Sequence, residues 1–296
     1  MISAAGRPVP TVRFGTRSLP VDRASVMAIV NRTPDSFYDR GATFSDQAAM
    51  AAVDCALAEG ADIVDIGGVK AGPGEDVGVT EETRRVVPFV AAVRQRHPNL
   101  LISVDTWRHE VARAALEAGA DIINDSWAGV DPKLSEVAAE YACGVVCSHT
   151  GGAPPRTRPH RVRYTDVVRE VIEDLTAQAV RLVQLGVPRE AILIDPTHDF
   201  GKNTWHGLEL LRRADELVDT GWPVLMALSN KDFIGETLDA GVDDRVDGTL
   251  AATAIAAWAR VRVFRAHQVR QTRRVLEMVA SIAGTRPPAR AVRGLA

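Results

Sequence analysis

The chain has 296 residues, of which 46% are apolar and 25% are charged, and its formal net charge at pH 7 is −3. This composition is typical of a globular protein with a large core, and the small charge gives no reason to expect nucleic acid or an anionic membrane as a partner. The first twenty residues contain no apolar signal core and no long apolar run follows, so we expect a cytoplasmic protein. Three cysteines without a disulfide-framework spacing favour free thiols in a reducing compartment.

Short apolar runs rich in β-branched residues recur along the chain, and amphipathic stretches with helical spacing lie between them. The segments ALAEGADIVDIGG and ALEAGADIINDSWAG are nearly the same, and each reads as helix, glycine and strand. Near-continuous apolar runs are typical of parallel strands that helices cover. We expect strands over residues 26–31, 62–67, 100–106, 121–126, 144–149, 191–196, 223–229 and 261–267.

Eight strand–helix units in about 240 residues predict a single (β/α)8 TIM barrel. An open, doubly wound sheet is the alternative, but no glycine-rich phosphate loop follows the first strand. We expect residues 21–284 to form the barrel and residues 1–20 to be an N-terminal extension that covers the bottom of the barrel or frays. Residues 285–296 are rich in Pro and Arg without periodicity, which predicts a mobile basic tail.

Polar or charged residues lie at the end of every predicted strand. The C-terminal ends of barrel strands converge on one mouth, so we expect a functional site there. Carboxylates and amides suit the edge of a flat nitrogen heterocycle, whereas cations suit phosphate, so the combination predicts a heterocycle with an anionic leaving group. Alternatively, Asp105 and Arg265 simply pair across the mouth. In chain order the strand-end residues are Asn31, Asp65, Asp105, Asn124, His149, Asp195, Ser229 with Lys231, and Arg265 with His267.

Several motifs around these positions resemble the signatures of dihydropteroate synthases. MAIVNRTPDSF resembles the first signature, and SVDTWRHEVARAALEAGADIINDSWAG resembles the stretch through the third and fourth strands. IDPTHDFGK, PVLMALSNKDFIGE and FRAHQV follow in the family's order. The resemblance covers roughly residues 24 to 283, and the colinear motifs make it specific. Membership of a family does not by itself establish an activity.

The resemblance implies a reaction and a set of site residues. In this family a pterin loses pyrophosphate from its methylene group, and the amine of p-aminobenzoate attacks the resulting cation. Asn31 would bind Mg²⁺ and, with Arg265 and His267, the pyrophosphate. Asp35 would stabilise the developing cation, and Asp35 and Lys231 are the predicted catalytic residues. The residues that would bind the pterin are Asp105, Asn124, Asp195, Phe200 and Lys231.

The chain departs from the family where the second substrate should bind. After the second strand the family has Glu–Ser–Thr–Arg, and this chain has Val69, Lys70, Ala71 and Gly72, so the loop loses a hydroxyl group and a guanidinium fork. Lys70 or Arg32 could restore the lost positive charge, which would make the exchanges neutral. Further departures are Arg32 for a small apolar residue, Thr150 for Met, Thr197–His198–Asp199 for Gly–Phe–Gly, Asn230 for Arg and Asp232 for Ser.

The leading hypothesis is a pterin-binding paralogue that is weak or inactive in condensing dihydropterin pyrophosphate with p-aminobenzoate. The departures cluster on one substrate's half of the site, and Asp232 would repel the carboxylate of p-aminobenzoate. The alternatives are an active synthase with a rebuilt second loop and a folate-binding methyltransferase on a related barrel; the TPDSF motif favours the synthases. We expect a pterin-like or aryl small molecule as ligand. Residues 247–260 are apolar around most of a helical circumference, which predicts a homodimer.

Overall fold

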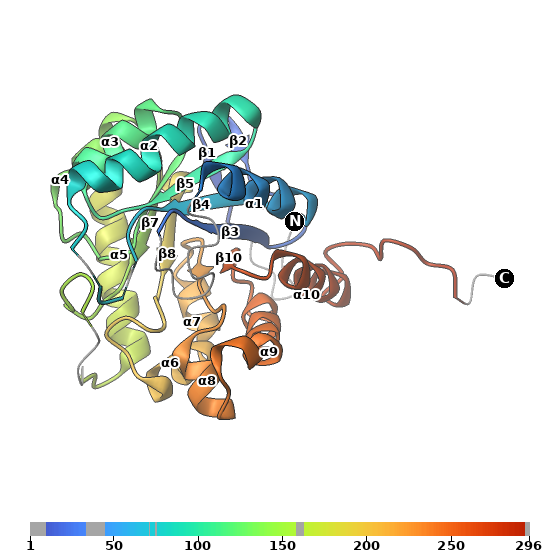
Figure 1. Ribbon diagram of the computed structural model, residues 1–296. Coiled ribbons are helices and arrows are strands. Elements are labelled where there is room, and N and C mark those ends of the chain that lie inside the picture. Colours follow the sequence, from blue (N-terminus) through green and yellow to red (C-terminus); the bar gives the residue numbers. More distant parts are fainter. Residues whose placement is uncertain (1–9, 34–44, 71, 75, 158–162, 294–296) are drawn as a thin grey trace.

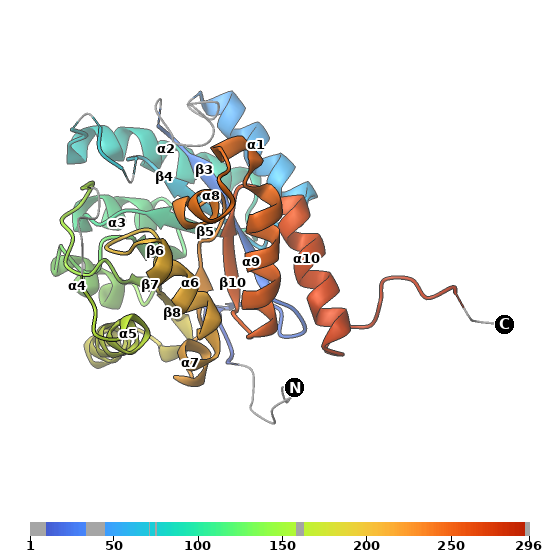
Figure 2. The ribbon, with the colours of Figure 1, turned by 90° about the horizontal axis from the view of Figure 1, so that it is seen from below.

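The barrel predicted from the sequence is present in the computed structural model, which describes residues 10–33, 45–70, 72–74, 76–157 and 163–293. Eight parallel strands form one sheet in the order β8–β7–β6–β5–β4–β3–β10–β9. A bridge between Ile194 and Val224 joins the two outer strands of that order, so the sheet closes on itself. Helices surround the strands on the outside (Figures 1 and 2). The (β/α)8 prediction is confirmed.

The elements follow the predicted order closely. The barrel strands are β3 Ser25–Asn31, β4 Ile63–Gly67, β5 Leu101–Asp105, β6 Ile122–Asp125, β7 Gly144–Ser148, β8 Ile192–Asp195, β9 Leu225–Met226 and β10 Val263–Ala266. The helices are α1 Asp46–Ala58, α2 Val79–Arg96, α3 His109–Glu117, α4 Lys133–Glu140, α5 Val167–Leu185, α6 Thr204–Arg212, α7 Ala214–Asp219, α8 Asp232–Leu238, α9 Val246–Trp258 and α10 Val269–Ile282. Strand β9 is much shorter than predicted, because its segment lies at the closing seam and begins at Pro223, which has no N–H to donate to a ladder.

A hairpin before the barrel closes its N-terminal end. Strands β1 Arg13–Phe14 and β2 Arg17–Ser18 pair antiparallel. Val12, Phe14 and Leu19 are buried in one cluster with barrel residues such as Met27 and Ile63. This segment therefore covers the bottom of the barrel and does not fray. At the other terminus, the chain after α10 extends away from the barrel, and residues 287–293 are exposed (Figures 1 and 2).

Strand alternation places an apolar layer at the bottom of the barrel and a polar layer at its mouth. Successive side chains of a strand point to opposite faces. In β4, Val64 and Ile66 pack in the cluster beneath the helices, whereas Ile63 belongs to the cluster at the bottom of the barrel. Asp65, two residues after Ile63, therefore faces the interior nearer the mouth. The same alternation in the neighbouring strands directs Asp105 and Asn124 inward.

Cys55, Cys143 and Cys147 are free, as the sequence predicts, and burial raises the pKa of Cys143 to about 12, so its thiol stays protonated. Within the described residues, no helix combines the length and the apolarity that a bilayer crossing needs.

The contact between Gly144 and the hairpin can be tested by adding one methyl group. A Cβ at Gly144 would lie 2.4 Å from Cδ1 of Phe14. We therefore expect Gly144→Ala to displace the β1–β2 hairpin and to lower the free energy of unfolding by about 1–3 kcal/mol in urea denaturation followed by circular dichroism. Gly241→Ala is the control, because a Cβ there meets nothing within 4 Å. Equal stability of the two variants would contradict the tight packing of the hairpin on Gly144.

Candidate functional site at the barrel mouth

A buried ion-pair cluster occupies the centre of the mouth. Asp65 is fully buried, and its Oδ2 accepts from Nε of Arg265 at 2.6 Å and from Nδ2 of Asn124 at 3.1 Å. Arg265 also donates from Nη2 to Oδ2 of Asp105 at 2.9 Å. The Oδ1 atom of Asp105 accepts from Oγ of Ser126 at 2.7 Å. Strands β4, β5, β6 and β10 thus bring these side chains together, and the Asp105–Arg265 pairing weighed from the sequence does occur.

Two carboxyl groups at the mouth have raised pKa values. Desolvation raises the pKa of Asp105 to about 6, although Arg265 acts in the opposite direction. Desolvation also raises the pKa of Asp195 to about 6, against the effect of the Thr197 N–H, which donates to Oδ1 of Asp195 at 2.8 Å. Burial thus makes both groups easier to protonate than an exposed aspartate.

A row of aromatic rings with a cation at one end comes from the loops after β5, β6, β8 and β9. The ring of Phe200 packs edge to face on Trp127, with centroids 4.7 Å apart, and Nζ of Lys231 lies 5.3 Å from the centre of the Phe200 ring. Trp107 continues the row, 6.3 Å from Trp127. The two tryptophans were not among the predicted site residues. The signal that could have found them is a tryptophan directly after a polar strand end, in VDTW and NDSW.

Lys202, also absent from the prediction, ties the loops after β7 and β8 together. Its buried Nζ lies 2.9 Å from both Nδ1 and the carbonyl oxygen of His149, 3.0 Å from the carbonyl oxygen of Phe200 and 3.3 Å from that of Thr197. Burial lowers the pKa of Lys202 to about 7 and that of His149 to about 3. The strand-end His149 is therefore a neutral part of the scaffold, with Nε2 3.2 Å from Oδ2 of Asp174.

Arg32 faces away from the mouth. Its guanidinium forms an ion pair with Asp46 at the start of α1 and lies 4.7 Å from the centre of the Phe89 ring on α2. Because residues at odd and even positions of β3 point to opposite faces, the neighbouring Asn31 faces the interior instead. The described contacts of Arg32 are therefore with α1 and α2, and they do not support the suggestion that it replaces the missing cation of the second loop.

Asp232 has a partner that the sequence analysis did not foresee. Its Oδ1 lies 2.8 Å from Nη1 of Arg245, which also donates to the carbonyl oxygen of Asn230 at 3.0 Å. Asn230 is buried and adopts a positive φ of 55°, which asparagine tolerates better than most residues. The negative charge of Asp232 is thus partly balanced, which weakens the expected repulsion of a ligand carboxylate.

The remaining predicted residues lie around the rim. Asn31 and Asp105 meet beside Gly67, where a Cβ would lie 3.8 Å from Oδ1 of Asn31 and 3.6 Å from Cβ of Asp105. The backbone N–H of His267 donates to Oγ of Ser229 at 3.2 Å. Asp35 and Ala71 lie outside the described residues. Val69, Lys70 and Gly72 are half-buried on the loop after β4, and Thr150 is buried at the start of the loop after β7.

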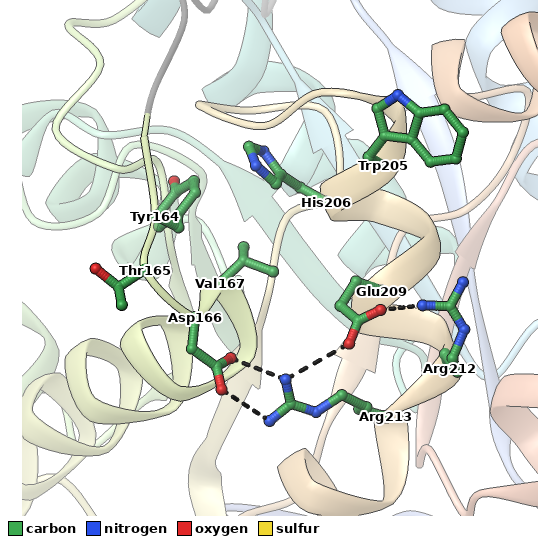
Figure 3. A pocket seen from close by; sticks show the side chains of 9 residues that line it. All are labelled: Tyr164, Thr165, Asp166, Val167, Trp205, His206, Glu209, Arg212 and Arg213. Atoms are coloured by element: carbon green, nitrogen blue, oxygen red, sulfur yellow. Dashed lines mark hydrogen bonds and ion pairs between the residues drawn. The ribbon is translucent and has the colours of Figure 1, made fainter.

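Two cavities open beside the barrel mouth, and no residue of the predicted pterin pocket lines them. One, of about 410 Å³, lies between the starts of α5 and α6 beside the exposed Trp205 (Figure 3). Arg213 bridges Asp166 at 2.9 Å and Glu209 at 3.5 Å in this cavity, so its guanidinium joins the two helices. The other, of about 260 Å³, borders His149. The convergence of the strand ends marks the candidate site more clearly than these hollows do.

The described residues also hold one cluster of possible metal ligands away from Asn31. His109, Glu110 and Asp131 could each offer one ligand atom. However, Oδ2 of Asp131 accepts from the backbone N–H of His109 at 2.9 Å and lies 2.7 Å from Nδ1 of the same residue. These contacts give Asp131 a structural role at the start of α3.

The raised pKa of Asp195 predicts a pH-dependent stability. Because its folded pKa of about 6 exceeds the ordinary 3.8, the folded state binds more protons and stability falls as the pH rises through this range. Asp195→Asn removes the penalty, so its stability advantage over the natural protein should widen by up to about 3 kcal/mol between pH 4 and pH 8 in urea unfolding. Asp54→Asn should change in the opposite direction, because Arg96 lowers the pKa of Asp54. A pH-independent difference for Asp195→Asn would contradict the assignment.

Comparisons with known proteins agree with this geometry. The pterin-binding enzyme family matches residues 27–267. The chain is 66% identical over 284 residues to inactive dihydropteroate synthase 2 of Mycobacterium leprae, covering 95% of this chain and 98% of that protein. It is 38% identical over 263 residues to dihydropteroate synthase of Escherichia coli, covering 88% and 93%. The crystal structure of Yersinia pestis dihydropteroate synthase with a sulfonamide drug complex matches with a TM-score of 0.87 at 31% identity, covering 93% of this chain and 100% of that one. The chain belongs to the pterin-binding enzyme family, and within it to the proteins that resemble dihydropteroate synthase.

Proposed function

We propose that this protein binds a pterin and is weak or inactive in condensing dihydropterin pyrophosphate with p-aminobenzoate. The observation that carries the proposal is the contrast between the two halves of the mouth. Asp105, Asn124 and Asp195 are each held by a hydrogen bond from or to a neighbouring residue of the fold, whereas the second loop has Ala71 and Gly72 where the family has Thr and Arg. The Mycobacterium leprae relative, which is named inactive dihydropteroate synthase 2, supports the same conclusion.

The pterin half offers both polar and stacking contacts. The carboxylates of Asp105 and Asp195 would accept N–H donors from the pterin edge, and the amide of Asn124 could donate or accept. A bound pterin would share Asp105 with Arg265, whose second contact, to Asp65, holds the guanidinium in place. Phe200 and Lys231 would pack against the ring.

The described residues fit Mg²⁺ as part of a substrate complex. Mg²⁺ prefers oxygen ligands, keeps several waters and binds proteins through one or two oxygens together with substrate phosphates. Asn31 offers a side-chain oxygen at the rim beside Gly67. Asn31 would hold the ion, Arg265 and His267 would hold the phosphates, and the ion would neutralise charge on the leaving group. Asp35, which together with Lys231 is a predicted catalytic residue, would stabilise the positive charge that develops on the pterin side of the breaking bond.

The aryl half is where turnover would fail. The amine must be held in line with the methylene, and a misplacement of about an ångström can cost roughly 100-fold. Loss of one transition-state donor costs a further 10²–10³, roughly. Lys70 stands beside Gly72 and can supply charge, but an ammonium lacks the planar fork of Arg.

An active synthase with a rebuilt second loop is the second candidate. The observation in its favour is the ion pair between Asp232 and Arg245 at 2.8 Å, which reduces the repulsion of the p-aminobenzoate carboxylate. The pair lies at an exposed edge, where such contacts contribute about 0–1 kcal/mol, so it offsets only a small part of the losses on the second loop.

Turnover distinguishes the two candidates. We expect the natural protein to show little or no condensation of dihydropterin pyrophosphate with p-aminobenzoate at saturating Mg²⁺, while calorimetry detects pterin binding. Replacing residues 69–72 by Glu–Ser–Thr–Arg, with Asn230→Arg and Asp232→Ser, should raise the rate by at least about tenfold, because it restores the missing donors. Asp105→Asn in that protein is the control, and it should lose pterin binding. A family-like rate in the natural protein would overturn the proposal.

The cysteines and the net charge support proposals about the compartment and the kind of ligand. Three free thiols suit a reducing cytoplasm. The net charge of −3 offers no general attraction for nucleic acid or anionic lipid, so a small molecule is the proposed ligand.

We further infer a homodimer that forms through α9 and α10, which lie side by side on the outside of the barrel (Figure 2). Large apolar side chains are exposed on both helices. Ile255 and Trp258 on α9 are 60% and 61% exposed, and Met278 and Ile282 on α10 are 62% and 60% exposed. A monomer seldom leaves such a group of residues in water, because their burial is favourable.

Charge placed on this surface should separate the subunits. We expect Trp258→Asp combined with Ile255→Glu to shift sedimentation at micromolar concentration from dimer to monomer. Trp205→Asp is the matched control, since Trp205 is 77% exposed on α6 and lies outside the proposed interface. A natural protein that sediments as a monomer would refute the dimer.

A further inference from the structure

The loop after β7 contains a tight turn that presents one arginine. The backbone N–H of Thr157 donates to the carbonyl oxygen of Pro154 at 3.3 Å, and Oγ1 of Thr157 donates to the same oxygen at 2.7 Å. Arg156 occupies the third position of this turn with a φ of 61°. That position in a turn with proline before it favours glycine, because a side chain there strains the backbone. An arginine at this position therefore carries a backbone cost that glycine would not carry.

The side chain of Arg156 reaches the loop after β4. Its Nε lies 3.4 Å from the carbonyl oxygen of Gly72. Strands β4 and β7 are separated by β5 and β6 in the sheet, so this contact brings together two loops from non-adjacent positions on the mouth. Among the described residues, a Cβ at Gly72 would meet Cε of Lys70, at 3.9 Å. Gly72 thus contacts Arg156 of the loop after β7 and has Lys70 of its own loop nearby.

The base of the arginine-bearing loop is also fixed. Lys202 holds the carbonyl oxygen of His149, and the backbone N–H of Ala153 donates to the carbonyl oxygen of Thr150 at 3.2 Å. Gly201 packs so closely on Thr150 that a Cβ there would lie 2.0 Å from its carbonyl oxygen. The loop is therefore pinned at His149 and Thr150 and turned at Pro154–Thr157, so the position of Arg156 is set by the fold.

We propose that Arg156, assisted by Lys70, binds the carboxylate of an aromatic co-ligand at the barrel mouth. This inference rests on the proposed function, because it assigns the second ligand of the same site. A guanidinium matches a planar carboxylate through two parallel hydrogen bonds, and the half-buried rings of Trp107 and Phe200, which pack on either side of the buried Trp127, offer apolar surface for an aryl group. The positive charge that the second loop lacks at Gly72 is thus supplied from the loop after β7.

The test uses Arg156→Gly in the full-length protein. Glycine suits the positive φ, so this variant should unfold at or above the temperature of the natural protein while it lacks the guanidinium. Calorimetry with saturating 6-hydroxymethylpterin compares p-aminobenzoate with p-aminobenzamide, which has the same ring without the charge. Inorganic pyrophosphate is titrated in parallel. We expect Arg156→Gly to weaken p-aminobenzoate binding by about 10-fold or more, and to change p-aminobenzamide binding less than about twofold.

Controls separate this proposal from its alternatives. Arg163→Gly removes the same charge from the same loop and should leave p-aminobenzoate binding unchanged, whereas Arg156→Lys should retain part of it. The proposal is overturned by equal losses in the two glycine variants, by natural protein that does not prefer the carboxylate to the amide, or by a loss confined to pyrophosphate. Arg156-dependent carboxylate binding without any pterin binding would support the proposal and reject the proposed pterin function.

Discussion

The barrel mouth depends on the buried contact between Asp65 and Arg265. Asp65 has no exposure, and its Oδ1 has no hydrogen-bond partner among the described residues, so its charge is compensated at Oδ2 by Arg265 and Asn124. Removal of one partner from a buried pair costs about 3–5 kcal/mol, because the other charge stays desolvated. Since Arg265 also holds Asp105, the same guanidinium fixes strands β4, β5 and β10 at their C-terminal ends.

This dependence accounts for the unequal state of the two halves of the site. Asp105, Asn124 and Arg265 belong to the ion-pair cluster, and Asp195 accepts the N–H that begins the loop after β8, so substitutions there would disturb the fold as well as any ligand. The buried cluster as described contains none of Val69, Lys70 and Gly72, and a Cβ added at Gly72 would make an ordinary contact, 3.9 Å from Cε of Lys70. The proposed pterin pocket can therefore persist for reasons of stability in a protein whose second loop departs from the family sequence.

The barrel could be predicted from the sequence because the alternation of side chains that marks its strands is a local pattern. Inward and outward residues alternate along each strand, and that pattern alone predicts where Asp105, Asn124 and Asp195 face. It was insufficient for side chains whose partners are distant or whose loops are irregular. No pattern in the sequence indicates where the side chain of Arg32 points, and in the structure it pairs with Asp46 on α1. The pairing of Arg245 with Asp232 and the four contacts of Lys202 depend on loop conformations that no periodicity encodes.

Binding and catalysis place different demands on such a mouth. Recognition of an aryl carboxylate needs a cation at the right distance, and in the proposed mode Arg156, which contacts Gly72, supplies it from the loop after β7. Condensation needs the amine at the far end of the same ring about 3–3.5 Å from the methylene carbon and in line with the leaving group. In the proposed mode, a guanidinium from the loop after β7 would hold the ring at a different angle from one on the loop after β4, and that change of angle would displace the amine at the far end of the ring. Charge can therefore be recovered while alignment is lost, so a protein of this kind can bind both ligands of a synthase and still fail to join them.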